Sequence, residues 1–538
     1  MLADCFFFIV SIFQKGLITT RITNVVPKKN VKSVRKLSQR LSTGPNAVAL
    51  FFFLLILVGS RQYGFFGDEL YYFACSKHLD FGYVDHPPMV ALLTFISTWI
   101  FGETMVGLRF LSGLVGAITV LLSAEIARLL GGGKFSQALA ALSICFAPAF
   151  PALSSFFSMN PVDIMLCTLF IVLFIKVVET PSPIKWIVLG VLLGIGLLNK
   201  YTFLVLGFSL LVSLLITKQR SLLKSPWIYV SGIISLLMFL PHILWQIHYN
   251  WPTLEFMRNA MEHKNLSLSP IAFFSQILIG LNPFTLPLWL SGVLYLIFNK
   301  EMKKYQFLGW TAVVFLVVYL VQNSKFYYVV PIFPLLLSSG AVMIEKFSQK
   351  HLIRWPKWAV MSTIIVSGAL LMPLATPLLP VEQFVRYSKA LGLWNLLRME
   401  KGEGDTLPLH FVHRFGWEEL ADSMGTVYNT LPQGDREKCA ILASNYGSAG
   451  AIDHFGPKHG LPNAICGRNS YWMWGTRDYS GEVVLAVGYS ARFLGRFFDS
   501  VEQVAYYKSR YAHDETIYLC KKPKFSLREI WPHFKYFI

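Results

Sequence analysis

The chain has 538 residues and a formal net charge of +18, with 54% apolar and only 14% charged residues. Soluble proteins carry roughly 25% charged residues, and many apolar runs in this sequence reach the ~20 residues that span a bilayer. These values exclude an ordinary soluble domain and predict a mainly α-helical, polytopic membrane protein. The basic residues lie in short loops between apolar runs, so we interpret them as determinants of membrane topology and expect no nucleic-acid partner.

The N-terminal residues 1–45 are predicted to form a basic cytoplasmic tail. From Lys15 to Arg40 they contain no acidic residue. The apolar stretch at 5–13 is too short to span a membrane and has no basic residue before it, so we do not expect a signal peptide.

Eleven membrane-spanning helices are predicted in the part of the chain that covers residues 46–384. The segment 89–101 is short and is expected to lie along the membrane interface. The segment 184–198 is also short for a span, which would fit a broken or tilted helix. The predicted spans lie at about 46–63, 105–130, 135–153, 159–178, 184–198, 201–217, 226–247, 271–298, 305–322, 326–345 and 356–377.

The loops between these spans predict the orientation of the protein in the membrane. With the N-terminus inside, every cytoplasmic loop carries Lys or Arg, and these loops are 131–134, 180–185, 218–224, 299–304 and 346–357. The opposite loops are less basic as a group and hold most of the loop carboxylates; they are 64–88, 154–158, 199–200, 248–270 and 323–325. The positive-inside rule therefore places the first long loop, 64–88, on the outer face.

Residues 385–538 differ from the rest, because charged residues, glycines and turn signals replace the long apolar runs. Short apolar segments at 439–444, 482–487 and 516–521 are typical of strands. We predict a small α/β domain on the same outer side as the first loop.

The seven cysteines show no spacing typical of a metal site. Cys439, Cys466 and Cys520 lie in the predicted α/β domain, where one disulfide is possible. Cys145 and Cys167 fall in apolar runs and are expected to be core residues.

The loop 64–88 contains two acidic sites, Asp68-Glu69 and Asp85, among several tyrosines. An acidic pair after a span can simply begin a solvated helix, since acids favour helix N-termini. Here Asp85 follows 17 residues after Asp68, so a folded loop could bring both carboxylates to one pocket. One would then act as general base, and the other as a metal ligand or an orienting partner.

Two lysines lie at the outer ends of predicted spans, where the positive-inside rule disfavours them. Lys200 follows the run GIGLLN, and Lys325 precedes FYYVVPIFP. Each side chain could snorkel to lipid headgroups, or could form an anion site, since lysine suits phosphate. Tyr327 and Tyr328 could add hydrogen bonds to a phosphate or belong to the interfacial aromatic belt.

The outer loop 248–270 offers further candidates. Arg258 could contact a phosphate, and the pair Glu262-His263 could bind a divalent metal that bridges phosphate oxygens. Two ligands do not make a complete metal site. His242 lies inside a predicted span, where it is either a functional residue or a buried, hydrogen-bonded histidine.

Several segments together resemble a known family. They are DELYYFACSKHL, YVDHPP, NKY, WQIHYNWPTLEF, MEHKN and SKFYYVVPIFPLL. In this order they resemble the bacterial branch of the protein O-mannosyltransferase (PMT) superfamily, which includes the lipid A aminoarabinose transferases. The resemblance covers about 46–345. The tail segments SNYGSAGAIDHFGPKHGLP and RNSYWMWG resemble the C-terminal domain of many bacterial members.

This resemblance implies a GT-C fold and a glycosyltransferase of the cytoplasmic (inner) membrane. Such an enzyme takes a sugar from a polyprenyl-phosphate donor on the outer, periplasmic face, by direct displacement with inversion. The lipid carries the activated sugar, so no nucleotide cofactor is expected. The acceptor is left open among lipid A, another envelope lipid, a polysaccharide and a protein hydroxyl.

The resemblance also assigns roles to individual residues. Asp68 falls on the family's catalytic aspartate, and Glu69 completes the acidic pair. Asp85 falls on a glutamate implicated in metal binding, and His263 on a metal-associated histidine. A divalent metal (Zn, Mg or Mn) at Asp85 and His263 is therefore a hypothesis to test.

The donor phosphate would be bound by a second group of residues: His86, Lys200, Arg258, Lys325 and Tyr328. His86 stands where the aminoarabinose transferases have a lysine near the phosphate. A neutral histidine is a poorer phosphate anchor, so either His86 is charged in the complex or Lys200 and Lys325 carry more of the phosphate.

Three other functions fit parts of the sequence. A transporter or flippase for a lipid-linked glycan would predict ionisable residues near mid-membrane and internal repeats. A glycan polymerase or ligase would share the topology and substrate class, but it fits the acidic loop less well. A membrane scaffold would keep its partner binding after both Asp68 and Asp85 are replaced.

Overall fold

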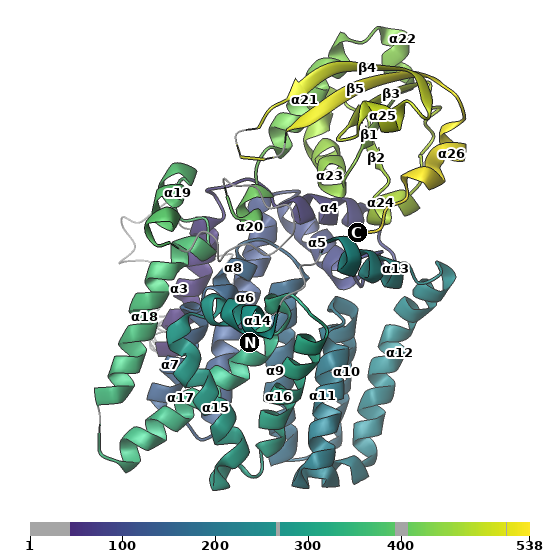
Figure 1. Ribbon diagram of the computed structural model, residues 1–538. Helices are drawn as coiled ribbons and strands as arrows, with labels where there is room; N and C mark the ends of the chain where they lie inside the picture. Colours follow the sequence, from purple (N-terminus) through teal and green to yellow (C-terminus); the bar gives the residue numbers. More distant parts are fainter. Residues whose placement is uncertain (1–43, 265–268, 354, 393–406, 510, 513) are drawn as a thin grey trace, which may run out of the picture.

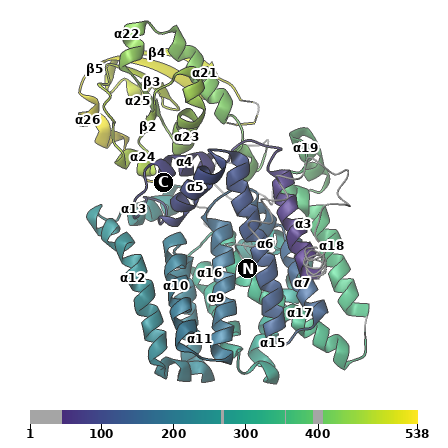
Figure 2. The same ribbon diagram turned by 180° about the vertical axis from the view of Figure 1, so that it is seen from behind.

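The computed structural model describes residues 44–264, 269–353, 355–392, 407–509, 511–512 and 514–538, and Figure 1 shows their arrangement. Almost all of the predicted N-terminal tail lies outside these residues. A bundle of long helices fills most of the molecule, and a smaller part with a β-sheet lies at one end of it. Figure 2 shows from behind that α4 and α5 lie between the two parts.

The bundle contains a helix for every predicted span. These helices are α3 (Gly44–Gly59), α6 (Met105–Leu129), α7 (Lys134–Cys145), α9 (Met159–Glu179), α10 (Pro183–Asn199), α11 (Thr202–Ile216), α12 (Pro226–His248), α15 (Leu286–Phe298), α16 (Gln306–Val321), α17 (Phe333–Lys350) and α18 (Trp355–Ala375). By length and composition alone, five described helices can cross a membrane, or seven if each bent pair counts as one span. A polytopic helical protein is therefore confirmed, while the number of eleven spans stays a prediction.

Two predicted spans are not single straight helices. The segment 135–153 is divided into α7 and a short α8 (Ala149–Ser154), which begins directly after Pro148. In the segment 271–298, α14 (Pro270–Gly280) meets the helical segment Pro283–Phe298 at 95°. The bend occurs at Asn282, whose φ is +69°, immediately before a proline.

The Asn282 side chain stabilises this bend inside the bundle. Its amide donates hydrogen bonds to the carbonyl of Ile364 (3.2 Å) and to Ser367 Oγ (2.9 Å), both on α18. Polar backbone groups at a bend inside a membrane protein need such partners. The segment 184–198, for which a broken or tilted helix was expected, forms one continuous helix, α10, without a break.

The C-terminal part contains a five-stranded sheet with the order β2-β1-β3-β5-β4. The strands are β1 (Cys439–Ala443), β2 (Ala464–Cys466), β3 (Val483–Val487), β4 (Phe498–Tyr507) and β5 (Glu515–Pro523). β1 pairs in parallel with β2 and β3, whereas β5 runs antiparallel to β3 and β4. The strands predicted at 439–444, 482–487 and 516–521 are confirmed as β1, β3 and β5.

Two strands were not predicted. β2 has only three residues, and β4 carries exposed polar side chains. Cys439, Cys466 and Cys520 are buried in separate strands and are all free, so the possible disulfide does not form in this structure.

The sheet packs directly on the first long loop, 64–88. α4 (Gly67–Lys77) contacts α23 (Tyr446–Phe455), and Leu70 and Tyr71 of α4 share a hydrophobic core with Leu485 of β3. A Cβ atom on Gly450 would lie 2.8 Å from the carbonyl carbon of Leu70. Only glycine allows this close approach of the two helices. The boundary at 385 stays a prediction, since the loop and the sheet build one core.

A polar contact through Glu103 also joins α4 and α23. Glu103, in the loop after α5 (Met89–Phe101), lies 2.8 Å from Lys77 Nζ and 3.3 Å from Nδ1 of His454 on α23. The hydrogen bond from His454, with help from Lys77, lowers the pKa of Glu103 to about 2, against the opposing effect of burial.

This contact predicts an acid-sensitive junction. Because the pKa of Glu103 is lower in the folded protein than its ordinary value of 4.5, the contact stabilises the fold above that value and is lost as pH falls toward about 2. We expect the Tm difference between wild type and Glu103→Gln, measured in detergent, to shrink between about pH 6 and about pH 3. A Tm difference that does not change with pH would contradict this role.

Candidate active site

Asp68 lies at the start of α4 and lines a cavity of about 260 Å³. Asn160, Gln276, Lys325, Tyr327, His410, His413 and Tyr446 are the other polar residues around it. The rest of the wall is apolar and comes mostly from α8, α14 and α18, including Leu153, Ile279, Leu371 and Leu374. The cavity therefore combines a carboxylate and an ammonium group with a surface suited to a hydrocarbon chain.

Glu69 does not line this cavity. Its side chain is fully buried and pairs with Arg109 of α6, with Oε2 2.8 Å from Nη2 and Oε1 3.1 Å from Nε. The same carboxylate accepts hydrogen bonds from the backbone N–H groups of Phe66 and Phe157, each at 2.8 Å. These contacts occupy Glu69 and support a positioning role for it, rather than contact with substrate.

Asp85 and His86 do not line this cavity either. The Tyr71 hydroxyl donates to Asp85 Oδ1 at 2.9 Å. Burial raises the pKa of Tyr71 well above its usual value, with a further contribution from Asp85, so this hydroxyl stays protonated and donates. His86 is fully buried between the rings of Tyr72 and Tyr83. This position gives His86 no contact with the cavity around Asp68.

A tyrosine from the C-terminal part joins the site. The hydroxyl of Tyr446, the first residue of α23, donates to Asp68 Oδ1 at 3.1 Å. The ring of Tyr446 packs on the ring of Tyr71, with centroids 4.8 Å apart. The sequence did not indicate Tyr446 as a site residue, because 378 residues separate it from Asp68. The one available signal was its place in the tail segment that resembles the family.

The predicted phosphate ligands fall into two groups. Lys200 Nζ donates to Asn160 Oδ1 at 2.7 Å and lies 4.4 Å from the ring centroid of Tyr328. Asn160 lines the Asp68 cavity, as Lys325 does. The structure thus brings Lys200, Lys325 and Tyr328 to the same end of the bundle, whereas Arg258 is exposed on α13 (Pro252–Asn259).

The segment before α21 (Trp417–Thr430) supplies two histidines that sequence analysis also missed. His410 and His413 line the Asp68 cavity. Burial lowers the pKa of His410 to about 4, so it is neutral at physiological pH. Arg414 holds this segment on the bundle through hydrogen bonds to the Ser155 carbonyl (3.2 Å) and hydroxyl (2.7 Å).

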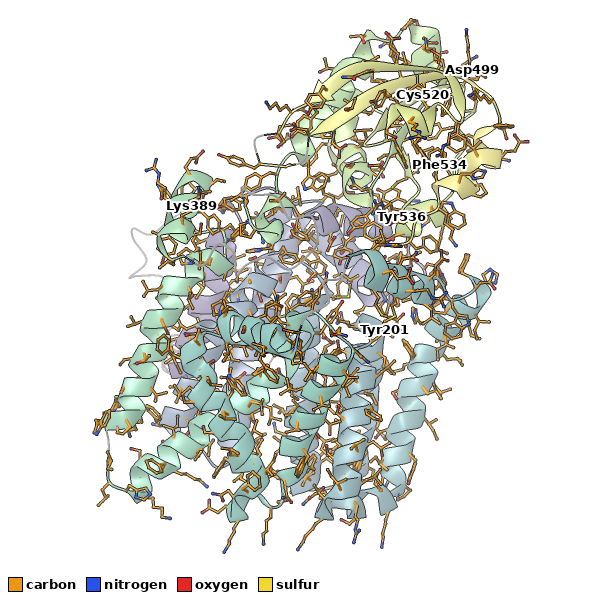
Figure 3. All side chains as sticks on the ribbon, in the orientation of Figure 1. Tyr201, Lys389, Asp499, Cys520, Phe534 and Tyr536 are labelled. Atoms are coloured by element: carbon orange, nitrogen blue, oxygen red, sulfur yellow. The ribbon has the colours of Figure 1, made fainter. Side chains whose placement is uncertain are left out.

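A second cavity, of about 390 Å³, lies where the sheet meets the bundle. It is located at the carboxyl end of β1, the edge where open α/β sheets commonly bind ligands. Its polar lining consists of His263, His413, Asn445, Tyr446, Ser448, Arg468, Tyr507, Glu515 and Tyr536. Figure 3 shows Tyr536 on the side of the sheet that faces the bundle. His413 and Tyr446 line both cavities.

Glu515 and Arg468 are ionisable side chains at the wall of the second cavity. Burial raises the pKa of Glu515 to about 7. The guanidinium of Arg468 packs over the ring of Tyr536 and donates to the Ser444 carbonyl at 3.1 Å. Arg468 is therefore held in place at the cavity wall.

The predicted metal ligands Asp85 and His263 are described separately by the structure. In the part of the chain that the structure describes, no group of three or more His, Cys, Asp or Glu side chains is placed to hold a metal ion. His263 is exposed and lines the second cavity, whereas Asp85 bonds to Tyr71. A metal at Asp85 and His263 therefore stays a prediction.

Comparisons with known sequences agree with the resemblance. A family model described as dolichyl-phosphate-mannose-protein mannosyltransferase matches residues 85–245. Lipid A galacturonosyltransferase RgtD from Rhizobium johnstonii is 24% identical over 322 residues, which cover 58% of this chain and 66% of that protein. Lipopolysaccharide core galacturonosyltransferase RgtB from the same organism is 24% identical over 243 residues, which cover 42% and 47%. The matches thus span less than two thirds of either relative.

Comparisons with solved structures show the fold. ArnT from Cupriavidus metallidurans bound to undecaprenyl phosphate gives a TM-score of 0.58 at 14% identity, covering 89% of this chain and 98% of that one. The apo state of the same protein gives 0.57 at 16% identity, covering 88% and 96%. This chain therefore has the overall fold of that transferase.

The Glu69–Arg109 pair makes a prediction about stability. Removing one partner of a buried ion pair leaves an uncompensated charge, which costs about 3–5 kcal/mol. We expect Arg109→Gln to lower the Tm in detergent strongly and to reduce the yield of monodisperse protein. Arg128→Gln, on the same helix, removes an exposed pair with Glu125 and should change stability by at most about 1 kcal/mol. Equal effects of the two substitutions would contradict the assignment.

Proposed function

We propose that this chain, which belongs to the PMT superfamily of glycosyltransferases with the GT-C fold, transfers a sugar from a polyprenyl-phosphate donor to an envelope acceptor. The observation that carries this proposal is the composition of the first cavity. Asp68 and Lys325 line it together with an apolar wall. A carboxylate suits the acceptor hydroxyl, an ammonium group suits the donor phosphate, and the apolar wall suits the polyprenyl chain.

The reaction we propose is one direct displacement. The acceptor oxygen attacks the anomeric carbon while Asp68 takes the hydroxyl proton as general base. The bond from the anomeric carbon to the phosphate oxygen breaks, and the configuration inverts. Polyprenyl phosphate leaves with its negative charge stabilised by Lys325 and Lys200. Tyr328 packs against the Lys200 ammonium and orients it.

His86 and Arg258 have smaller parts in this proposal than in the sequence-based prediction. His86 is buried among aromatic rings, and Arg258 lies on the exposed face of α13. Lys200 and Lys325 therefore carry the phosphate charge.

The acceptor would reach Asp68 from the second cavity. The two cavities are neighbours, since Tyr446 and His413 line both of them. Arg468 at this cavity suits an acceptor with anionic groups. The relatives RgtD and RgtB are named for transfer to lipid A and to the lipopolysaccharide core. A phosphorylated or acidic envelope glycolipid is accordingly the acceptor class we propose, with the reaction on the periplasmic face of the inner membrane.

Asp68→Asn tests the proposed base. The amide keeps the size of the side chain but does not accept the proton, so we expect turnover with purified lipid donor to fall about 100-fold or more. The control is Asp499→Asn, an exposed residue on the outer side of the sheet (Figure 3). Both variants should insert, purify and melt like wild type. Near wild-type turnover in Asp68→Asn would refute the role.

Lys200→Gln and Lys325→Gln test the phosphate site. Each loses a cation at the cavity, so we expect the affinity for undecaprenyl phosphate, measured as product inhibition or by direct binding, to fall about tenfold, equivalent to about 1.4 kcal/mol. Lys185→Gln is the matched control, since Lys185 lies near the opposite end of α10, whose outer end precedes Lys200. Unchanged affinity in both cavity variants would exclude these lysines as phosphate ligands.

A further inference from the structure

Tyr446 occupies a rigid position at the boundary of the two cavities. It follows the short turn Ser444-Asn445 after β1, where Asn445 Oδ1 accepts the Ser448 N–H (2.8 Å) and caps α23. A Cβ on the next residue, Gly447, would lie 2.7 Å from the ring of Trp417. The turn that presents Tyr446 is thus held by a helix cap on one side and by a packed indole on the other.

The ring of Tyr446 forms a bridge between the acidic sites of the first loop. Its hydroxyl bonds to Asp68 (3.1 Å), and its ring packs on Tyr71, whose hydroxyl bonds to Asp85 (2.9 Å). The backbone N–H of Ser470 donates to the Tyr71 hydroxyl at 3.2 Å. Two packed rings, Tyr71 from the first loop and Tyr446 from the sheet side, therefore connect the two carboxylates of this loop.

A tyrosine hydroxyl that donates to a carboxylate has two effects on a general base. It selects one rotamer of the acid, which fixes the direction of proton transfer. It also favours the charged form, because hydrogen bonds to a carboxylate stabilise the ionised state. Both effects would act on Asp68, the residue that takes the proton in the proposed reaction.

We infer that Tyr446 is a positioning residue for sugar transfer, through which the C-terminal sheet holds the catalytic carboxylate of the membrane bundle. This inference rests on the proposed function of Asp68. It assigns the sheet a direct part in the reaction step, in addition to shaping the acceptor cavity. The transfer site is then complete only when α23 is docked on α4.

Tyr446→Phe isolates the hydroxyl, because the phenyl ring preserves the packing on Tyr71 and the wall between the cavities. We expect kcat to fall about tenfold while KM for the lipid donor stays near wild type. The acidic limb of the kcat/KM profile should move to higher pH, since a carboxylate that loses a donor is protonated more easily. A purely structural role would lower the Tm without moving this limb.

Tyr506→Phe provides the matched control. Its hydroxyl also donates to a carboxylate, Asp514 Oδ2 at 2.7 Å, but on the exposed part of β4. We expect no change in kcat or in the pH profile. Tyr446→Ala removes the ring as well, and its kcat should fall further than that of Tyr446→Phe.

The outcomes separate this inference from the proposed function. Wild-type kcat and pH profile in Tyr446→Phe, with an inactive Asp68→Asn, would overturn the role of Tyr446 and leave the transferase function intact. Retained turnover in Asp68→Asn would overturn both. A lower kcat and a shifted acidic limb in Tyr446→Phe, with unchanged donor KM, would support the role.

Discussion

The buried pair between Glu69 and Arg109 determines where the site can form. Taking two charges out of water is costly, and only additional hydrogen bonds compensate for the cost. Arg109 supplies them by donating to the carbonyls of Ser60 and Gly64, each at 2.7 Å, where the chain leaves α3. Glu69 accepts from the backbone at the start of α4 and from Phe157 before α9. One ion pair thus fixes α3, α4, α6 and the entry to α9, and α4 carries Asp68.

The sheet region also fixes the position of α4. α23 packs on α4, and the shared core joins residues far apart in the chain. The segment matched by the family model, 85–245, contains neither Asp68 nor Tyr446. The chemistry proposed here therefore depends on contacts that form outside the most recognisable segment, at a junction where Gly450 allows two helix backbones to meet.

Local patterns predicted the elements of this protein better than their relations. Apolar run lengths placed the helices, and short apolar segments placed three of the five strands. Adjacent residues were harder to interpret: successive side chains on a helix point about 100° apart, so Asp68 lines the cavity while Glu69 faces Arg109. The sequence did not distinguish these two roles. Tyr446 could not be predicted for another reason, because only tertiary packing brings α23 to α4. The bend at Asn282 depends on partners supplied by α18.

The proposed phosphate site would explain why lysines stand where the predicted topology disfavours them. In the predicted topology Lys200 lies on the outer face, where the positive-inside rule disfavours it, so it needs a compensating role or environment. Its hydrogen-bond and ring partners are the neutral Asn160, Tyr327 and Tyr328. An acidic side chain, Asp163, also interacts electrostatically with Lys200. It is buried on α9, about one turn after Asn160. Neutral partners orient an ammonium group without cancelling its charge, which leaves that charge available for a phosphate. An ammonium group with neutral partners can still stabilise an incoming anion. The proposed site for a lipid-phosphate leaving group requires this property.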